Sequence, residues 1–359
     1  MSVTVSSLGE HALIQRITSR LAMPSWVIVG PGDDAAVLEP ERGAFDVLTT
    51  DAVIEGVHFD RRYVPPDAIG HRALAVNLSD LAAMGAHPRA ALLSLAIPDS
   101  CEVGDIDGLV DGLVTLADVH RVALIGGNIT RTPGPMMVDV TAIGSVRPRR
   151  ILRRAGARPG DEVYLTGSLG DAAVGLRALQ RDADVRGANL PRPSGAPEGL
   201  GPRTTDGVEA DLQVGLRACV ERYLRPQPRV RAGMLLGRAR AASSCMDLSD
   251  GLADALRQVC EASGVGMKID ADALPVSDAV RRWIGDHAID PLRLTMSGGD
   301  DYELLFTVRP AHRGRLRQVR REVGDLPITR IGTVTKDRAV LLNGVQGARE
   351  LPQGYEHFR

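Results

Sequence analysis

The stretch "AVNLSDLAAMG", Ala75 to Gly85, decides how the first half of this chain is interpreted. Its alanines, leucines and methionine predict a helix that is buried on most sides, within a helical stretch from Asp67 to Met84. Asp80 interrupts the apolar run. Aspartate is a poor helix former, and an unpaired buried carboxylate costs several kcal/mol. We therefore interpret Asp80 as a ligand-binding residue.

The segments around this helix predict alternating strands and helices, and hence an α/β (α+β) fold. We expect strands at 45–53, 89–97, 121–127, 136–146, 162–166, 266–271, 302–308, 328–335 and 339–344. Ser7 and Glu10 predict a capping box for a first helix. We place a domain boundary near residue 149, between an N-terminal domain 1–148 and a C-terminal domain 149–359. Residues 182–207, rich in Pro, Gly and charge, predict a mobile insertion.

Composition indicates a globular protein of two domains. The chain has 359 residues, of which 44% are hydrophobic and 25% charged, and its net charge of −2 points to neither nucleic acid nor an anionic membrane. The four cysteines lack a CxxC spacing, so reduced thiols in a cytoplasmic protein fit best. No basic and apolar signal sequence opens the chain, and no apolar run is long enough to span a membrane.

A set of aspartates adjoins glycines or the ends of predicted elements. Its members are Asp33, Asp34, Asp51, Asp80, Asp247, Asp250, Asp300 and Asp301. Such a supply of carboxylates suits several Mg²⁺ ions, which prefer oxygen ligands. Other interpretations stay open for three sites: "GDDA" as a turn with an N-cap, Asp250 as the cap of the next helix, and the pair at 300 and 301 as a turn before a strand.

Phosphate binding has weaker signals. No GxxxxGK[ST] loop is present, and "GGNITRT", Gly126 to Thr132, could equally be a plain turn after a strand. A carboxylate and a phosphate repel by about 4 kcal/mol at ~4 Å and an effective dielectric near ~20, so Mg²⁺ would have to bridge them. Arg154 could clamp a phosphate or belong to a solvated basic linker. His58 could be functional or an ordinary core or surface histidine.

A short sequence motif that contains an aspartate occurs in both halves of the chain. The triplet LSD of "NLSDLAAMG" at Asn77 recurs in "DLSDGLADAL" at Asp247, at the start of another predicted helix. The repeat is compatible with internal duplication or with coincidence. It suggests that both domains direct acids toward one place.

Together these motifs resemble the thiamine-monophosphate kinase family. The matching segments are "GEHALIQRI", "GPGDDAAVL", "TTDAVIEGVHF", "HRALAVNLSDLAAMGAHP", "LIGGNITR", "LRRAGARPGDEVYLTG", "MDLSDGL", "SGGDDYELLFTV" and "GYEHF". They cover nearly the whole chain except 182–207. The resemblance implies a two-domain fold of the aminoimidazole-ribonucleotide-synthetase-like superfamily. In such a fold the mixed sheets of two N-terminal domains pair into a β-barrel across a homodimer, and the active site lies between the domains.

The resemblance also implies an activity and a set of site residues. The activity is ATP-dependent phosphorylation of thiamine monophosphate to thiamine diphosphate, with Asp80 and Arg154 central to catalysis. Residues implied to bind Mg²⁺ are Asp34, Thr49, Thr50, Asp51, Asp80, Asn128, Asp247 and Asp250. Those implied to contact ATP are Gly127, Asn128, Arg154 and Ser249, and those implied to contact thiamine monophosphate are His58, Asp300 and Tyr355.

Two residues depart from the family's pattern. Asn128 stands where Asp is common after the two glycines, which removes a charge from that metal position. Asp300 stands where Glu is common, and its side chain is one methylene shorter. Two alternative functions stay open: an ATP-dependent cyclo-ligase of the aminoimidazole ribonucleotide synthetase type, and a non-catalytic sensor that binds Mg²⁺ and ATP.

Overall fold

The computed structural model describes residues 3–186, 207–287, 289–344 and 347–351. The chain forms two compact units, each described by itself below. The first is built mainly from Met1–Leu81 and His87–Val146, the second mainly from Arg147–Asp182 and Leu200–Arg359 together with Ala82–Ala86. Among the helices so described, none is both long and apolar enough to cross a membrane.

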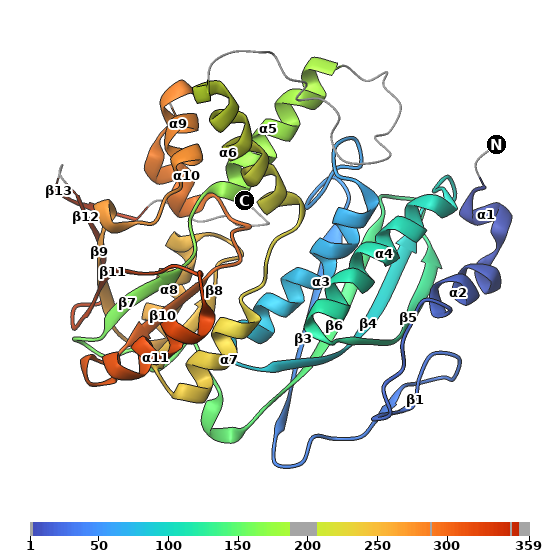
Figure 1. The fold of residues 1–359 in the computed structure, drawn as a ribbon, viewed down its shortest axis with the longest axis horizontal. Coiled ribbons are helices and arrows are strands. Elements are labelled where there is room, and N and C mark those ends of the chain that lie inside the picture. Colours follow the sequence, from blue (N-terminus) through green and yellow to red (C-terminus); the bar gives the residue numbers. More distant parts are fainter. Residues whose placement is uncertain (1–2, 187–206, 288, 345–346, 352–359) are drawn as a thin grey trace. The chain divides into compact units, whose positions relative to one another are not determined.

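The first unit is a mixed four-stranded sheet with helices on one face. Its elements are α1 (Val5–Leu8), α2 (Glu10–Thr18), β1 (Val27–Val29), β2 (Val37–Leu38), β3 (Phe45–Ile54), α3 (Pro66–Ala83), β4 (His87–Ile97), α4 (Val103–His120), β5 (Ala123–Arg131) and β6 (Met137–Val146). The sheet has the order β3-β6-β4-β5, with β4 and β5 parallel and the other pairs antiparallel. Figure 1 shows α3 and α4 over the same face of this sheet. The mixed sheet expected from the sequence is confirmed.

Glycines let α3 and α4 approach each other closely. A Cβ atom on Gly70 would lie 1.8 Å from the carbonyl oxygen of Leu109, and one on Gly112 would lie 1.9 Å from that of Asp67. Any larger side chain at either position would have to push backbone away. The buried α3 that carries Asp80 is therefore held by direct backbone packing against α4.

The predicted capping box at the N-terminus is wrong. Ser7 lies inside α1, where its hydroxyl donates to the carbonyl of Thr4. Gly9, with a φ of +84°, separates α1 from α2, and no side chain caps α2. The glycine's freedom to adopt positive φ breaks the helix where the Ser and Glu pattern predicted a start.

The second unit is a seven-stranded sheet covered by helices. Its elements are η1 (Pro148–Arg150), β7 (Glu162–Thr166), α5 (Asp171–Arg186), α6 (Gly207–Leu224), α7 (Val230–Ala239), β8 (Ala242–Asp247), α8 (Leu252–Ser263), β9 (Gly266–Asp270), η2 (Ala271–Ala273), α9 (Asp278–His287), α10 (Pro291–Ser297), β10 (Leu304–Val308), η3 (Pro310–His312), α11 (Arg313–Val323), β11 (Ile328–Thr335), β12 (Val340–Gly344) and β13 (Gly347–Glu350). The strand order is β13-β12-β9-β11-β7-β10-β8.

Both faces of the central strands in this sheet are buried. Val163 and Leu165 pack with residues of α8 in one hydrophobic cluster. Tyr164, between them on the strand, faces the other way, and the Arg320 guanidinium of α11 lies 5.6 Å from its ring centre. Figure 1 shows α11 beside α7. The sheet is thus sandwiched between α8 and the pair formed by α7 and α11.

A small group of helices completes the second unit. One hydrophobic cluster joins α5, α6, α9 and α10 through Ala173, Val174, Cys219, Val280 and Leu294. The sequence did not predict α10. The insertion predicted at 182–207 needs correction at its start, because α5 continues through Arg186. Residues 187–206 of that predicted insertion lie outside the described residues.

The close crossing of α3 and α4 generates a stability prediction. Gly112→Ala should destabilise the protein by about 1–3 kcal/mol, because a Cβ at this position collides with backbone. Gly104→Ala on the same helix is the matched control, since nothing lies within 4 Å of its Cβ and alanine favours helix. Urea unfolding of both variants measures the difference. Equal stabilities would contradict the proposed backbone packing.

Candidate active site

Asp80 occupies the last turn of α3. The carboxylate is half-buried rather than fully buried, which corrects the interpretation of this position as the middle of a buried helix. The Thr49 hydroxyl on β3 donates to Asp80 Oδ2 over 2.5 Å. A negative charge at a helix C-terminus opposes the helix dipole, and among the described residues no basic side chain is paired with Asp80. A bound cation would offset this cost.

The two adjacent threonines of β3 face opposite sides of the sheet. Thr49 contacts Asp80, whereas the Thr50 hydroxyl donates to Asp139 Oδ1 over 3.0 Å and lies 3.1 Å from the Thr141 hydroxyl. Because side chains alternate along a strand, the exposed Asp51 lies on the face of Thr49. The structure therefore does not bring the Thr49 and Thr50 side chains, predicted to share a metal cluster, to one point.

His58 follows β3 in a tight turn. Its Nδ1 accepts a hydrogen bond from the backbone N–H of Ile54 over 3.1 Å. This bond fixes the ring at the end of the strand.

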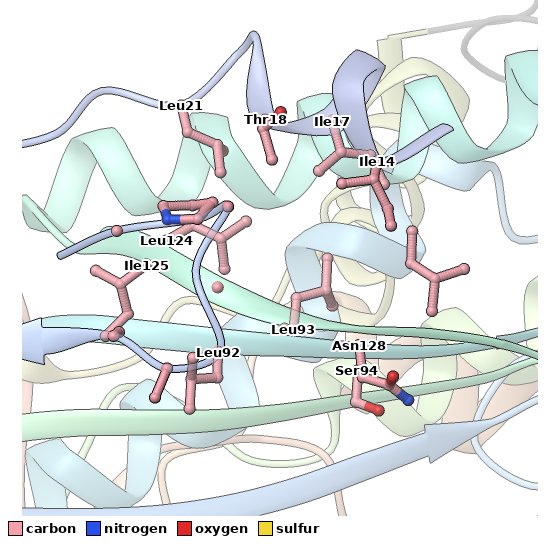
Figure 2. A pocket seen from close by; sticks show the side chains of 18 of the residues that line it. Ile14, Ile17, Thr18, Leu21, Leu92, Leu93, Ser94, Leu124, Ile125 and Asn128 are labelled. Atoms are coloured by element: carbon pink, nitrogen blue, oxygen red, sulfur yellow. The ribbon is translucent and has the colours of Figure 1, made fainter. Parts of the chain in front are cut away.

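A pocket of about 760 Å³ lies within the first unit. Figure 2 shows apolar side chains of α2 and the following residues above those of β4 and β5, with Ser94 and Asn128 at one end. The pocket is also lined by Asp34, which lies in the exposed loop between β1 and β2, and by Gly127. The structure thus brings three predicted site residues, Asp34, Gly127 and Asn128, around one pocket. No helix starts after Asp34, so the alternative role of "GDDA" as a helix cap is wrong.

The packing of β4 against β5 requires glycine at position 127, in addition to the ATP contact predicted for this residue. A Cβ on Gly127 would lie 1.8 Å from the carbonyl oxygen of Leu93 on the neighbouring strand β4. A shift of register between Ala91 and Leu92 accompanies this close pairing of β4 and β5. The backbone at Gly127 is therefore exposed to the pocket without a side chain to cover it.

In the second unit, the structure brings the "DLSD" and "SGGDD" motifs side by side. Asp247 is the buried last residue of β8, and Asp300 precedes the neighbouring strand β10. Backbone bonds join the two segments: Asp300 N–H donates to the Ser249 carbonyl over 2.7 Å, and Tyr302 N–H to the Leu248 carbonyl over 2.9 Å. The predicted residues Asp247, Ser249, Asp250 and Asp300 therefore share one end of the sheet.

Asp250 does not cap α8. The N-cap residue is Gly251, and no side chain makes a capping bond there. The alternative interpretation of Asp250 as a helix cap is therefore wrong. Residues 300 and 301 lie in the irregular segment just before β10, and the alternative interpretation of this pair as a turn stays open.

Arg154 lies on the surface beside α8. Its Nη1 donates to Gln258 Oε1 over 2.5 Å, and Gln258 Nε2 donates to Asp254 Oδ2 over 2.5 Å. This short chain of hydrogen bonds orients the guanidinium along the helix that starts after Asp250. The sequence predicted Arg154 but missed Gln258, which carries no charge or motif that would mark it.

Two carboxylates of the "GDDYE" motif are drawn into the fold, Glu303 fully and Asp301 in part. Glu303 is fully buried, accepts from the Thr166 hydroxyl over 2.7 Å and is gripped by both Nε and Nη2 of Arg229. Both oxygens of Asp301 lie 3.1 Å from the N–H of Gly170. Burial raises the pKa of Asp301 well above its ordinary value, and the carboxylate of Asp171 adds to the rise. Asp301 therefore has a structural contact of its own, which ties the segment before β10 to Gly170.

The oxygen ligands in each unit fit Mg²⁺. Among the described residues no three His, Cys, Asp or Glu side chains converge closely enough to hold a metal by themselves. Mg²⁺ commonly uses only one or two carboxylates, with phosphates and waters filling its other positions. Asp80 with Thr49, and Asp247 with Asp250, offer donors of this kind.

One predicted site residue has no described position, and the sequence did not predict two residues whose side chains contact predicted site residues. Tyr355 lies outside the described residues. That Asp80 and Asp247 approach the same phosphates stays a prediction. Asp139 was missed although "VDVT" in a strand signals polar side chains on one face, and Tyr302 was missed because its contact depends on the fold.

Comparisons with known proteins agree along the chain. Residues 32–146 match the family described as AIR synthase related protein, N-terminal domain, and residues 158–342 match its C-terminal domain. The thiamine-monophosphate kinase of Salmonella typhimurium is 37% identical over 98% of both chains.

Solved structures show the same similarity. The crystal structure of thiamine-monophosphate kinase from Stenotrophomonas maltophilia K279a is 39% identical, with a TM-score of 0.76 over 94% of this chain and 97% of that one. AaThiL complexed with AMPPCP and TMP is 30% identical, with a TM-score of 0.71 over the whole of both chains.

The raised pKa of Asp301 leads to a prediction about pH. Because its pKa is raised in the folded state, the stability that it contributes is present at low pH and is lost as pH rises above about 4, the ordinary value for Asp. Asp301→Asn, which stays neutral, should therefore gain stability relative to the wild type between pH 5 and pH 8. Urea unfolding at both pH values measures this gain. Asp325→Asn, at an exposed site, is the control, and a pH-independent difference for Asp301→Asn would contradict the prediction.

Proposed function

This chain belongs to the thiamine-monophosphate kinase family, and we propose that it transfers the γ-phosphoryl group of ATP to thiamine monophosphate, forming thiamine diphosphate for thiamine diphosphate biosynthesis. The observation that carries this proposal is the similarity to those kinases over nearly the full length of the chain, which includes the acid motifs around Asp80, Asp247 and Asp300. The solved complex of a 30% identical relative with AMPPCP and TMP supports ATP and thiamine monophosphate as the two substrates.

The pocket of the first unit would receive the nucleotide. Its apolar lining suits the base of ATP, and its polar end carries Asn128 and the bare backbone of Gly127. Asp34 would supply an oxygen ligand to Mg²⁺ at this pocket. Asp80, Thr49, Thr50 and Asp51 are proposed to supply further oxygen ligands on the helix-covered face, where the Thr49 hydroxyl meets Asp80. Thr50 can contribute there through its backbone carbonyl, since its hydroxyl points to Asp139.

The second unit would contribute the remaining contacts. Asp247 and Asp250 would hold Mg²⁺, Ser249 and Arg154 would contact ATP, and Asp300 would contact thiamine monophosphate. The Gln258 amide orients Arg154. In the first unit His58, whose ring the Ile54 N–H fixes through Nδ1, is proposed to contact the substrate, and Tyr355 is proposed as a further substrate contact.

The proposed reaction requires no strong general base from the protein. The acceptor is a phosphate oxygen that is already ionised at neutral pH, so we propose direct transfer without a phosphoenzyme. Bound Mg²⁺ would supply neutralisation of the phosphate charges. The chain's own part is to align donor and acceptor and to place the Arg154 guanidinium beside the transferred group.

A homodimer is part of the proposal. The sheet of the first unit has helices on one face, whereas Leu48 on the other face is 66% exposed, and β3 is a sheet edge. An exposed apolar side chain on an open edge strand suits pairing with a second copy. We also propose a cytoplasmic location, which the four buried free cysteines support.

One assay separates the kinase from its alternatives. Purified protein is incubated with ATP, Mg²⁺ and thiamine monophosphate, and in parallel with the substrate of aminoimidazole ribonucleotide synthetase. Thiamine diphosphate in the first reaction alone supports the proposal. Product in the second would identify the cyclo-ligase, and binding of Mg²⁺ and ATP without either product would identify a sensor.

Asp80 tests the metal role. Asp80→Asn should lower kcat at least ~100-fold, because loss of one charged ligand removes stabilisation of the transferred phosphate. Asp118→Asn, an exposed carboxylate in the last turn of α4, is the matched control and should keep full activity. Circular dichroism confirms folding of both variants. Full activity in Asp80→Asn would exclude the proposed role.

Leu48 tests the dimer. Leu48→Lys should shift the protein toward monomers in sedimentation velocity, because the charge would be buried in the paired sheet. Val119→Lys is the control, since Val119 is 72% exposed on the helix-covered side. If both the Leu48→Lys and the Val119→Lys variants remain dimers, pairing through the open sheet face is contradicted.

A further inference from the structure

The segment that carries Arg154 is fixed to the second unit through its backbone. The N–H groups of Gly156 and of the next residue both donate to the hydroxyl of Ser263, the last residue of α8, over 3.1 and 3.2 Å. A Cβ on Gly156 would lie 2.3 Å from the carbonyl oxygen of Ser243, so this segment packs directly against backbone. The base of the Arg154 side chain is therefore held in place.

The tip of the Arg154 side chain meets a chain of hydrogen bonds along α8. Arg154 donates to Gln258 Oε1, and Gln258 Nε2 donates to Asp254 Oδ2, four residues earlier on the helix. A guanidinium group can only donate hydrogen bonds, and an ionised carboxylate can only accept them. An amide between the two must therefore point its oxygen at the arginine and its nitrogen at the aspartate. Asp254 thus fixes which end of the Gln258 amide faces Arg154.

The amide also keeps two opposite charges apart. Among the described residues no carboxylate forms an ion pair with the exposed Arg154, and the partner at its tip is the neutral Gln258. The negative charge of Asp254 lies in the first turn of α8, where the helix dipole favours it. A glutamate at position 258 would pair directly with the guanidinium and offset its charge. With glutamine, the arginine is oriented and keeps its full charge.

We propose that Gln258 is a positioning residue, which holds Arg154 for a phosphate of ATP without neutralising it, and that Asp254 sets the direction of the Gln258 amide. This inference rests on the proposed function, in which Arg154 contacts ATP. A phosphate is attracted by the full charge of the guanidinium, and a side chain that is held in advance loses less freedom when the phosphate binds. The amide supplies the position, and the arginine alone supplies the charge.

Two substitutions at position 258 separate position from charge. Gln258→Ala frees the Arg154 side chain and should lower kcat/KM for ATP about threefold, the effect of one hydrogen bond. Gln258→Glu still binds the arginine but offsets its charge, and should lower kcat/KM for ATP about tenfold. KM for thiamine monophosphate should change in neither variant. If Gln258 were only an anchor, glutamate would serve as well as glutamine. Wild-type kcat/KM in either variant would therefore overturn the proposal.

Gln318 provides the matched control. Its amide donates to Glu322, four residues further along α11, over 2.9 Å. Gln318→Glu adds the same charge to another helix of the same unit, away from Arg154, and should leave kcat/KM for ATP unchanged. A loss in Gln318→Glu equal to that in Gln258→Glu would overturn the proposal.

Ionic strength gives a readout that a merely structural role would not move. The loss in Gln258→Glu, measured relative to the wild type, should shrink as salt is added, because salt screens charges at an exposed site. The loss in Gln258→Ala should not shrink, since no charge has changed. A loss in Gln258→Glu that is independent of salt would contradict the role assigned to charge.

A double mutant shows whether Gln258 acts through Arg154. Adding Gln258→Ala to an Arg154→Ala background should cause no further loss of kcat/KM for ATP. A loss of the same size in both backgrounds would overturn the positioning role.

Asp254→Asn tests the direction of the amide and covers the case in which a Gln258 variant does not fold by circular dichroism. Asparagine can donate as well as accept, so the Gln258 amide could turn its nitrogen toward Arg154. We expect a loss of about threefold in kcat/KM for ATP. Asp278→Asn, at an exposed site in the first turn of α9, is the control and should cause no loss. Wild-type kcat/KM in Asp254→Asn would overturn the part assigned to Asp254.

The wild-type protein distinguishes the two levels of inference. If it forms no thiamine diphosphate, the proposed function fails, and the positioning role fails with it. If it forms thiamine diphosphate and Gln258→Glu is equally active, the proposed function stands and the positioning role alone is overturned.

Discussion

The buried carboxylate of Glu303 holds one end of the second unit together. It accepts from the Thr166 hydroxyl at the end of β7, and Arg229, just before α7, grips both of its oxygens. Gly167 leaves the space that this carboxylate fills, since a Cβ there would lie 1.9 Å from it. Removing one partner of such a pair costs about 3–5 kcal/mol, because the other charge stays buried. The placement of Asp300, Asp247 and Asp250 depends on this anchor, since the Glu303 carbonyl bonds to Leu248.

In the first unit, the alternation of side chains along β3 divides the polar residues between two faces. Thr49 and Asp80 lie under the helices, whereas Thr50 and Asp139 lie on the other face, which Asp139 shares with the pocket lining. A metal site that draws on both threonines must therefore use backbone oxygen from one of them. A strand can in this way present ligands to two environments with successive residues.

Much of the fold follows from local patterns, because periodic apolar residues and short β-branched runs determine which elements can bury a face. Asp80 could be singled out for the same reason, since a carboxylate within an apolar helix conflicts with its surroundings. Gln258 and Asp139 could not, because their roles arise from contacts between segments distant in sequence. The predicted capping box is wrong because Gly9, at positive φ, separates α1 from α2 between Ser7 and Glu10.

The open edge of β3 has a consequence for how the protein is made in the cell. A newly folded chain carries a ten-residue strand with one side unpaired among the described residues, and Phe45 and Leu48 on it are exposed. The unpaired backbone groups of such an edge can form hydrogen bonds with any other extended chain as readily as with a second copy of this strand. In the homodimer proposed above, two copies would cover this edge for each other. The rate of their encounter depends on the square of the protein concentration, so slow synthesis would leave the edge of each copy exposed for longer.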